Sequence, residues 1–269
     1  MKAAFFALAL LIPAAALASE IGPEALDSLP PADVVVLGEV HDNPAHHQNQ
    51  ARAVAAVQPK ALVFEMLTPD QASRARPEIM ADAKALEAAL GWEGTGWPDF
   101  AMYAPIFAAA PAARVHGAAV PRESLMGADP ETLARRLLGD PARYGLDQPL
   151  PQAEQRAAEA EQKAAHCNAL PDDILPRMVA IQRLRDAALA HAAANALAET
   201  GGPVVVITGS GHARTDRGMP VNLRAALPDI RILSVGQIEG EAGDEPFDLW
   251  IATPPIDRPD PCAGFAAGG

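Results

Sequence analysis

The sequence has few aromatic residues and few basic residues relative to acidic ones. Only 4% of its 269 residues are aromatic, and 21 Lys and Arg stand against 34 Asp and Glu. The resulting formal charge of −13 argues against nucleic acid as a partner, because nucleic-acid binding requires Lys and Arg to neutralise phosphates. It argues equally against an anionic membrane surface. A small anionic ligand held by a few local arginines remains compatible with this charge.

Long apolar runs are also missing, since no segment after the N-terminus approaches the ~20 residues that a membrane span needs. At the N-terminus, Met1 and Lys2 precede an apolar stretch, and Ala16-Leu17-Ala18 fits the small-x-small pattern of a cleavage site. We therefore expect residues 1–18 to be a secretory signal removed near Ala18, with a membrane anchor as the alternative. No cysteine follows the cleavage region, so no lipid attachment is expected there.

Cysteine is scarce, with only Cys167 and Cys262 in the chain. An even number in an exported protein favours a disulfide, and two free thiols are the alternative. Their spacing matches neither a zinc ribbon nor a Cys-x-x-Cys redox motif, so we assign them no chemistry.

Several catalytic motifs are absent or broken. The chain has no phosphate-binding Gly-Lys-Ser/Thr loop and no complete Gly-x-Gly-x-x-Gly. The segment around Gly209-Ser210-Gly211 is not a nucleophile elbow, because His212 and Ala213 replace the residues that this motif requires.

What the sequence does contain is a repeated pattern of a β-branched run followed by Gly-x-x-His. Val34 to Leu37 precede Gly38-Glu39-Val40-His41, and Val204 to Thr208 precede Gly209-Ser210-Gly211-His212. Such runs are typical of strands buried on both faces of a parallel α/β sheet, which binds ligands at the carboxyl ends of its strands. If the two strands are neighbours, His41 and His212 share one edge of the sheet.

The rest of the pattern predicts an α/β fold with a mixed, mostly parallel central sheet flanked by helices. We expect a single domain over residues 19–269, with a helical insertion at about 130–200 that contains a long helical hairpin. The expected strands lie at 33–37, 61–65, 114–120, 203–208, 230–235 and 248–252, and the expected helices at 44–57, 69–90, 130–138, 151–165 and 172–199.

Polar side chains follow three of these strands. Glu39, His41, Glu65 and His212 offer mixed nitrogen and oxygen donors that suit Zn, Mn or Fe, although a capping or core role is the simpler reading of each alone. Asp42 is expected either to orient His41 or to cap the next helix.

Other candidates come from helices. Gln182, Arg185 and Asp186 share one face of a long helix, which either is solvated or points toward the site. Surface or structural roles are expected for His46, His47 and His191.

This donor set is compatible with a metal-dependent hydrolase. A metal on His41, His212 and a carboxylate would activate water, with Glu39 or Glu65 accepting its proton. Arg122 or Arg185 would stabilise the developing oxyanion. Asp186 is also a candidate catalytic residue, without an assigned step. A vestigial site that only holds the sheet edge together is the other reading.

The aromatic residues are concentrated in residues 91–107, which include Trp97, Phe100, Tyr103 and Phe107. This cluster is either a satellite core or a flat apolar wall that contacts a ligand or a second subunit.

Several of these motifs, in this order, resemble the ChaN-like haem-binding uptake proteins, a family in a superfamily with the erythromycin esterases and the TraB/Tiki proteases. The resemblance covers nearly the whole mature chain. The motifs that carry it are Leu37-Gly38-Glu39-Val40-His41-Asp42-Asn43, Phe64-Glu65-Met66, Trp97-Pro98-Asp99-Phe100, Tyr103-Ala104-Pro105-Ile106-Phe107, Val120-Pro121-Arg122, Gln182 with Arg185-Asp186, and Thr208-Gly209-Ser210-Gly211-His212-Ala213-Arg214.

The resemblance implies a periplasmic, homodimeric protein of haem or iron uptake, a binding protein rather than an enzyme. It implies that Tyr103 ligates ferric haem while Trp97, Phe100 and Phe107 cover the macrocycle. Relatives include lipoproteins, whose lipidated Cys this chain lacks.

Overall fold

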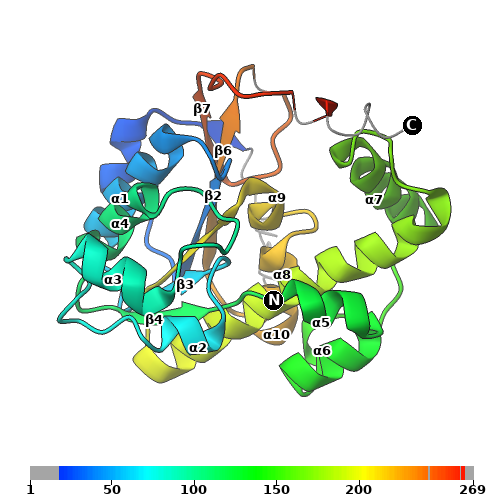
Figure 1. Cartoon of the computed structure of the whole chain (residues 1–269), viewed down its shortest axis with the longest axis horizontal. Helices are drawn as coiled ribbons and strands as arrows, with labels where there is room; N and C mark the ends of the chain where they lie inside the picture. The colour runs from blue at the N-terminus through cyan, green and yellow to red at the C-terminus, as the bar shows by residue number, and fades with distance from the viewer. Residues whose placement is uncertain (1–17, 242, 261, 264–269) are drawn as a thin grey trace, which may run out of the picture.

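The fold is a seven-stranded sheet with helices on both faces, seen in a computed structural model that describes residues 18–241, 243–260 and 262–263 (Figure 1). The strand order is β1-β7-β6-β2-β5-β3-β4, and every pairing between these strands is parallel. The expected α/β class is confirmed, although no antiparallel strand is found in the described residues. Residues 1–17, which make up nearly all of the predicted signal, lie outside the described part.

The strands and helices follow the predicted order closely. The strands are β1 Ser19–Glu20, β2 Val34–Glu39, β3 Ala61–Phe64, β4 Arg114–Gly117, β5 Val204–Gly209, β6 Ile232–Glu239 and β7 Leu249–Thr253. The helices are α1 Pro44–Val57, α2 Pro69–Ala72, α3 Ala83–Leu90, α4 Phe100–Ala109, α5 Arg122–Gly127, α6 Pro130–Leu138, α7 Gln152–Ala165, α8 Leu175–Thr200, α9 Ser210–Ala213 and α10 Met219–Ala226, with short 3₁₀ turns at Pro23–Ser28, Pro141–Tyr144 and Asp172–Ile174.

Alternation along the central strands divides the core into two layers. Val35 and Leu37 of β2 pack with α1, α3 and α4, whereas Val34 and Val36 pack with α6, α8 and α10 on the opposite face. Because both faces are covered, β2 and β5 are apolar along almost their whole length, as the sequence pattern predicts.

The region 69–90 differs from the expected single helix, because it forms two short helices, α2 and α3. Pro77 interrupts it, since proline supplies no backbone N–H, and Asp82 then caps α3 by accepting a hydrogen bond from the Ala85 amide at 3.0 Å.

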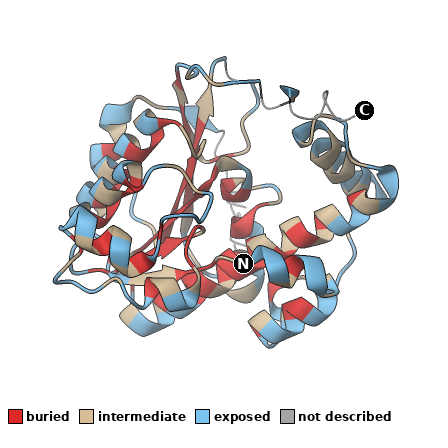
Figure 2. Ribbon diagram, viewed as in Figure 1, coloured by how far each residue is buried: buried red, intermediate tan, exposed pale blue. Residues whose placement is uncertain are grey.

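The helix α7 lies against α8 and contributes no residue to the hydrophobic core. None of its side chains is buried, as Figure 2 shows. The predicted disulfide is present and joins Cys167, just after α7, to Cys262 in the C-terminal tail. An ion pair between Glu161 of α7 and Arg217 adds a second link. In the described residues no helix combines the length and apolarity that crossing a membrane would require.

Candidate functional site

The polar site lies at the carboxyl edge of three adjacent strands, β2, β5 and β3. β2 pairs with β5 so that Glu39 stands beside Gly209, and β3 pairs with the other side of β5. The proposed neighbour relationship between the two Gly-x-x-His strands is therefore confirmed. The pairing brings Glu39, Glu65 and His212 to one edge, although they are far apart in the chain.

One cluster is centred on the buried carboxylate of Glu39. Its Oε1 accepts hydrogen bonds from His41 Nδ1 at 2.7 Å and from the Tyr103 hydroxyl at 2.8 Å. The Nδ1 atom of His47 lies 3.5 Å from Oε2, and His47 Nε2 donates to the His41 carbonyl at 2.8 Å. Glu39 therefore fixes the orientation of the His41 ring, which was one of the two roles expected for Asp42.

The imidazole of His41 faces outward from this cluster. Its side chain is 36% exposed, and its ring lies edge-on to Trp97 with 4.9 Å between centroids. Burial lowers the pKa of His41, but the hydrogen bond to Glu39 and the charges of Glu65 and Glu39 outweigh burial and raise it overall. A Cβ on Gly209 would lie 3.0 Å from His41 Nε2, so glycine leaves room for the ring.

A second cluster holds His212 between two carboxylates. His212 Nδ1 donates to Asp186 Oδ1 at 2.6 Å, and Nε2 lies 3.4 Å from Glu65 Oε1. The other Glu65 oxygen accepts from Thr208 Oγ1 at 2.7 Å and from the Gly209 amide at 2.8 Å. Burial alone would lower the pKa of His212, but Glu65 and Asp186 raise it to about 10, so the ring is an imidazolium at neutral pH.

The arginine candidates differ in position. Arg185 lines a small cavity of about 80 Å³ together with Glu65 and Trp97, and the adjacent Asp186 reaches His212, so this face of α8 points inward. Arg122 is exposed at the start of α5 and does not line this cavity. The prediction that Arg122 stabilises an oxyanion in the site is therefore not supported.

The predicted metal centre at Glu39, His41, Glu65 and His212 is not supported. Glu39 Oε1, His41 Nδ1, His212 and both Glu65 oxygens are engaged in two separate clusters of hydrogen bonds and ion pairs. Asp186 takes the His212 Nδ1 that a metal would compete for. Over the described ranges, no group of three or more His, Cys, Asp and Glu is arranged to hold a metal ion.

The first turn of α1 forms hydrogen bonds with the backbone that follows β2. Asn43 caps the helix, which places His46 and His47 in its first turn beside the end of β2. His46 accepts from the Val40 amide at 2.8 Å and bonds Thr253 Oγ1 at 2.8 Å, and burial lowers its pKa to about 4. Both histidines have a structural role, which was one of the two roles expected for them. The Asn43-Pro44 cap pattern in the sequence indicates their position in the first turn of the helix.

Asp42 turns away from His41 and forms an ion pair with Arg258 of the C-terminal tail, 2.9 Å apart. Arg258 also contacts Glu239 at the end of β6, at 2.6 Å. No sequence pattern indicates this contact, because Arg258 lies in a Pro-rich tail without periodicity.

The aromatic segment belongs to the core in this structure. Phe100 and Phe107 are buried, and Phe107 stacks on Phe64 with 4.2 Å between centroids. Tyr103 is 0% exposed and its hydroxyl donates to Glu39, so it has no open side for a haem. Three residues of the predicted haem pocket, Phe100, Tyr103 and Phe107, therefore fill the layer between α4 and the sheet, and the fourth, Trp97, is partly buried against His41.

Comparison with known proteins identifies the family. Residues 25–223 match the family described as haem-binding uptake, Tiki superfamily, ChaN. The chain belongs to this family. No curated protein matches the sequence.

Solved structures also match the chain at low sequence identity. One is described as "Cofacial heme binding to ChaN of Campylobacter jejuni", with a TM-score of 0.60 and 21% identity over 84% of this chain and 88% of that one. The type III effector HopBA1 matches 86% of this chain and 91% of its own with 18% identity and a TM-score of 0.41.

Proposed function

We propose that this protein binds haem and serves in haem or iron uptake. The observation that carries the proposal is the family match over residues 25–223. The similar Campylobacter jejuni structure, whose description names cofacial haem binding, shares the fold and also supports haem binding. Hemin titration of the purified protein, followed by absorbance, tests the proposal. A titration that shows only free hemin would contradict it.

Tyr103 as the axial ligand is the more specific form of this proposal. For Tyr103 to ligate iron, its hydroxyl would have to leave Glu39 and α4 would have to move, because the side chain is fully buried. A phenolate ligand gives ferric haem a charge-transfer band that Tyr103→Phe would abolish. If the wild-type and Tyr103→Phe spectra agree, Tyr103 is not the ligand.

A periplasmic location and a homodimer are further parts of the proposal. The disulfide between Cys167 and Cys262 supports export, since such bonds persist in oxidising compartments. N-terminal sequencing of the protein from a periplasmic extract should begin near Ser19. Light scattering with and without hemin should give the mass of two chains in at least one state.

A second candidate is hydrolysis at the sheet edge, favoured by the geometry of His41. Glu39 fixes Nδ1, and the ring is partly exposed beside the cavity that Arg185 lines. This arrangement suits a general base, with Arg185 near the charge that would develop on an acyl oxygen. Activated esters should be hydrolysed by the wild type and not by His41→Ala, with Glu93→Gln as an exposed control. Equal rates in all three proteins would remove this candidate.

A further inference from the structure

We propose that the groove between α7, α8 and α10 binds a small carboxylic acid with an alkyl chain, and that Arg183 of α8 holds its carboxylate. The groove has a volume of about 410 Å³, which is typical of a small-molecule site. Both other helices pack against α8, and Figure 1 shows α7 at the right of the molecule, above the first half of α8. This site is separate from the proposed haem binding and does not depend on it.

One face of α8 forms a wall of the groove. Val179, Gln182, Arg183 and Asp186 line it, and their spacing places them on the same side of the helix. Asp186 accepts from Nδ1 of His212 at 2.6 Å, and Gln182 Nε2 lies 3.3 Å from both nitrogens of that ring. Arg183 is therefore the charged residue of this face that His212 does not engage.

The guanidinium of Arg183 is partly buried without a carboxylate partner among the described residues. Its Nη2 donates to the Gly145 carbonyl at 3.0 Å and to the Gln148 carbonyl at 2.9 Å, whereas Nε and Nη1 donate to no described residue. Burial lowers the pKa of Arg183, although the charge of Asp186 opposes this effect. A cation that has lost water and has no counter-charge is stabilised by an anionic ligand.

The other charges of the groove are compensated or hydrated. Within the described ranges, every other charged lining residue except Glu154 belongs to an ion pair. The pairs are Arg214 with Asp216, Arg217 with Glu161, and Asp186 with His212. Glu154 is exposed, so water solvates its carboxylate. The groove therefore has one desolvated charge to satisfy, and that charge is positive, although the whole chain carries −13.

The groove also offers apolar surface for a chain. Val221 of α10 is 41% exposed, and in the described residues only Met126 is a more exposed large hydrophobic side chain. Leu150 and Ala158 line the groove on its α7 side, and neither is buried. An alkyl chain between α7 and α10 would remove these side chains from water. A carboxylate at one end and an alkyl chain at the other define the ligand class, and a medium-chain fatty acid is its simplest probe.

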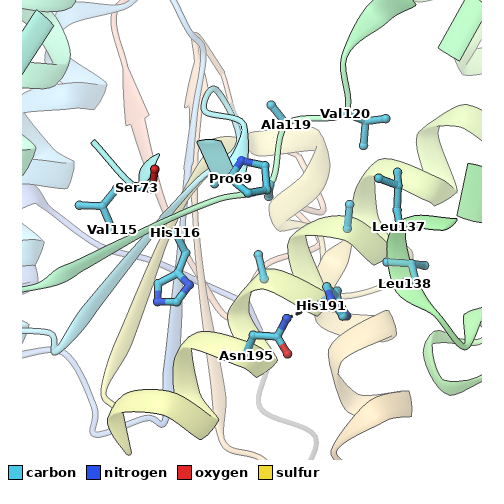
Figure 3. A pocket seen from close by; sticks show the side chains of 14 residues that line it. Pro69, Ser73, Val115, His116, Ala119, Val120, Leu137, Leu138, His191 and Asn195 are labelled. Carbon is cyan, nitrogen blue, oxygen red and sulfur yellow. Dashed lines mark hydrogen bonds between the residues drawn. The ribbon is translucent and has the colours of Figure 1, made fainter. Parts of the chain in front are cut away.

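The cavity between β4, α2, α6 and α8 lacks a group that could hold a carboxylate. Figure 3 shows it from close by, with His191 and Asn195 on one wall. Its volume is about 390 Å³, and no Asp, Glu, Lys or Arg is among the residues that line it. His191 is engaged with the Tyr144 hydroxyl and with Asn195, each at 2.9 Å.

The cavity on the other side of Arg183 is also less suited. It lies between α6 and α8, has a volume of about 490 Å³, and is lined by Asp140 and Asp147 as well as Arg183. These two carboxylates would repel an anion, so the groove beside α7 is the better side for the ligand.

The test is isothermal titration calorimetry of the full protein with octanoate and, separately, with 1-octanol. Octanoate should bind the wild type about tenfold more tightly than 1-octanol does, because only octanoate carries the charge that Arg183 complements. Arg183→Gln should weaken octanoate binding by about tenfold and leave 1-octanol binding unchanged, a selective loss that misfolding would not produce. Arg136→Gln removes the same charge from an exposed position outside the groove and should bind octanoate normally.

A steric pair on α7 tests the position of the chain. Ala158 lines the groove, so Ala158→Trp should weaken the binding of octanoate and 1-octanol alike. Its exposed neighbour Ala157 does not line the groove, so Ala157→Trp is the matched control and should bind both normally. Equal octanoate affinity in the wild type, Arg183→Gln and Ala158→Trp would overturn the site. A wild type that does not bind octanoate would overturn the ligand class.

Discussion

Asp186 Oδ1 accepts a hydrogen bond from His212 Nδ1 at 2.6 Å, across 26 residues of chain. The contact joins the middle of α8 to the short helix α9 after β5, and Glu65 approaches the same ring from β3. The buried imidazolium therefore connects a helix to two strand ends, and its titration should control stability.

The first prediction concerns the loss of thermal stability as the pH rises above neutral. The folded pKa of His212 is raised from 6.5 to about 10, so its stabilisation is complete below pH 6.5 and is lost as the pH rises to about 10. Burial raises the pKa of Asp186, which acts in the same direction. The thermal midpoint of the wild type should fall between pH 6.5 and 10.

At acid pH, Glu65 has the opposite effect, because stability is lost as the pH falls. Burial alone would raise the pKa of Glu65, but the contacts with His212 outweigh burial and lower it from 4.5, so its contribution to stability is lost as the pH falls below 4.5. His212→Gln should be less stable by about 3–5 kcal/mol near pH 6, because it leaves two buried carboxylates without a cation. It should also lack the alkaline fall. A parallel decline in both proteins between pH 6.5 and 10 would contradict this assignment.

The second prediction concerns His41. Glu39→Gln removes the carboxylate that accepts from Nδ1, so the pKa of His41 should fall. Imidazole NMR titration measures this directly, with the exposed Glu93→Gln as control. An unchanged midpoint in Glu39→Gln would mean that Glu65, and not Glu39, sets the protonation of the ring.

The third prediction concerns the link from the tail to β6. Arg258 is the main cause that lowers the pKa of Glu239 from 4.5 to about 2. The stabilisation from this pair is present above pH 4.5 and is lost as the pH falls to about 2. Arg258→Gln should therefore show a shallower acid decline in thermal midpoint than the wild type. Arg135→Gln, which breaks the exposed pair with Glu131 on α6, should follow the wild-type curve.

The fourth prediction concerns the disulfide. Replacing both Cys167 and Cys262 with Ser should reduce stability by about 2–5 kcal/mol, because the bond closes a large loop. Since α7 buries no side chain, it should also become the preferred site of limited proteolysis in the variant. Reductant should reproduce both effects in the wild type and change nothing in the variant. Equal resistance of α7 in all samples would show that its packing against α8 is sufficient.

The central sheet could be predicted because its signals are local. The Val-rich runs ending at Gly38 and Gly209 specify strands buried on both faces, and their shared Gly-x-x-His pattern suggested that they are neighbours. Six of the seven strands were expected; the short β1 was not, because two residues carry no periodic signal.

The contacts within the site could not be predicted in the same way. The helix α4 is apolar around most of its circumference, so the sequence does not tell whether Tyr103 faces a ligand or Glu39. Likewise, Gln182, Arg185 and Asp186 indicate one helix face but not its direction. Tertiary packing of α8 against β3 and β5 decides that direction.

The strand order has a consequence for how the protein is made. β2 and β3 are consecutive strands, yet β5 lies between them, and Val34 contacts Val204 on one side and Ile232 on the other. During synthesis, a nascent chain that ends before β5 leaves both edges of β2 and one edge of β3 without a partner. Such edges favour pairing with other chains. The sheet edge that carries Glu39 and Glu65 can therefore assemble only once β5, Val204–Gly209 in a chain of 269 residues, has been made, which makes early folding intermediates dependent on protection from aggregation.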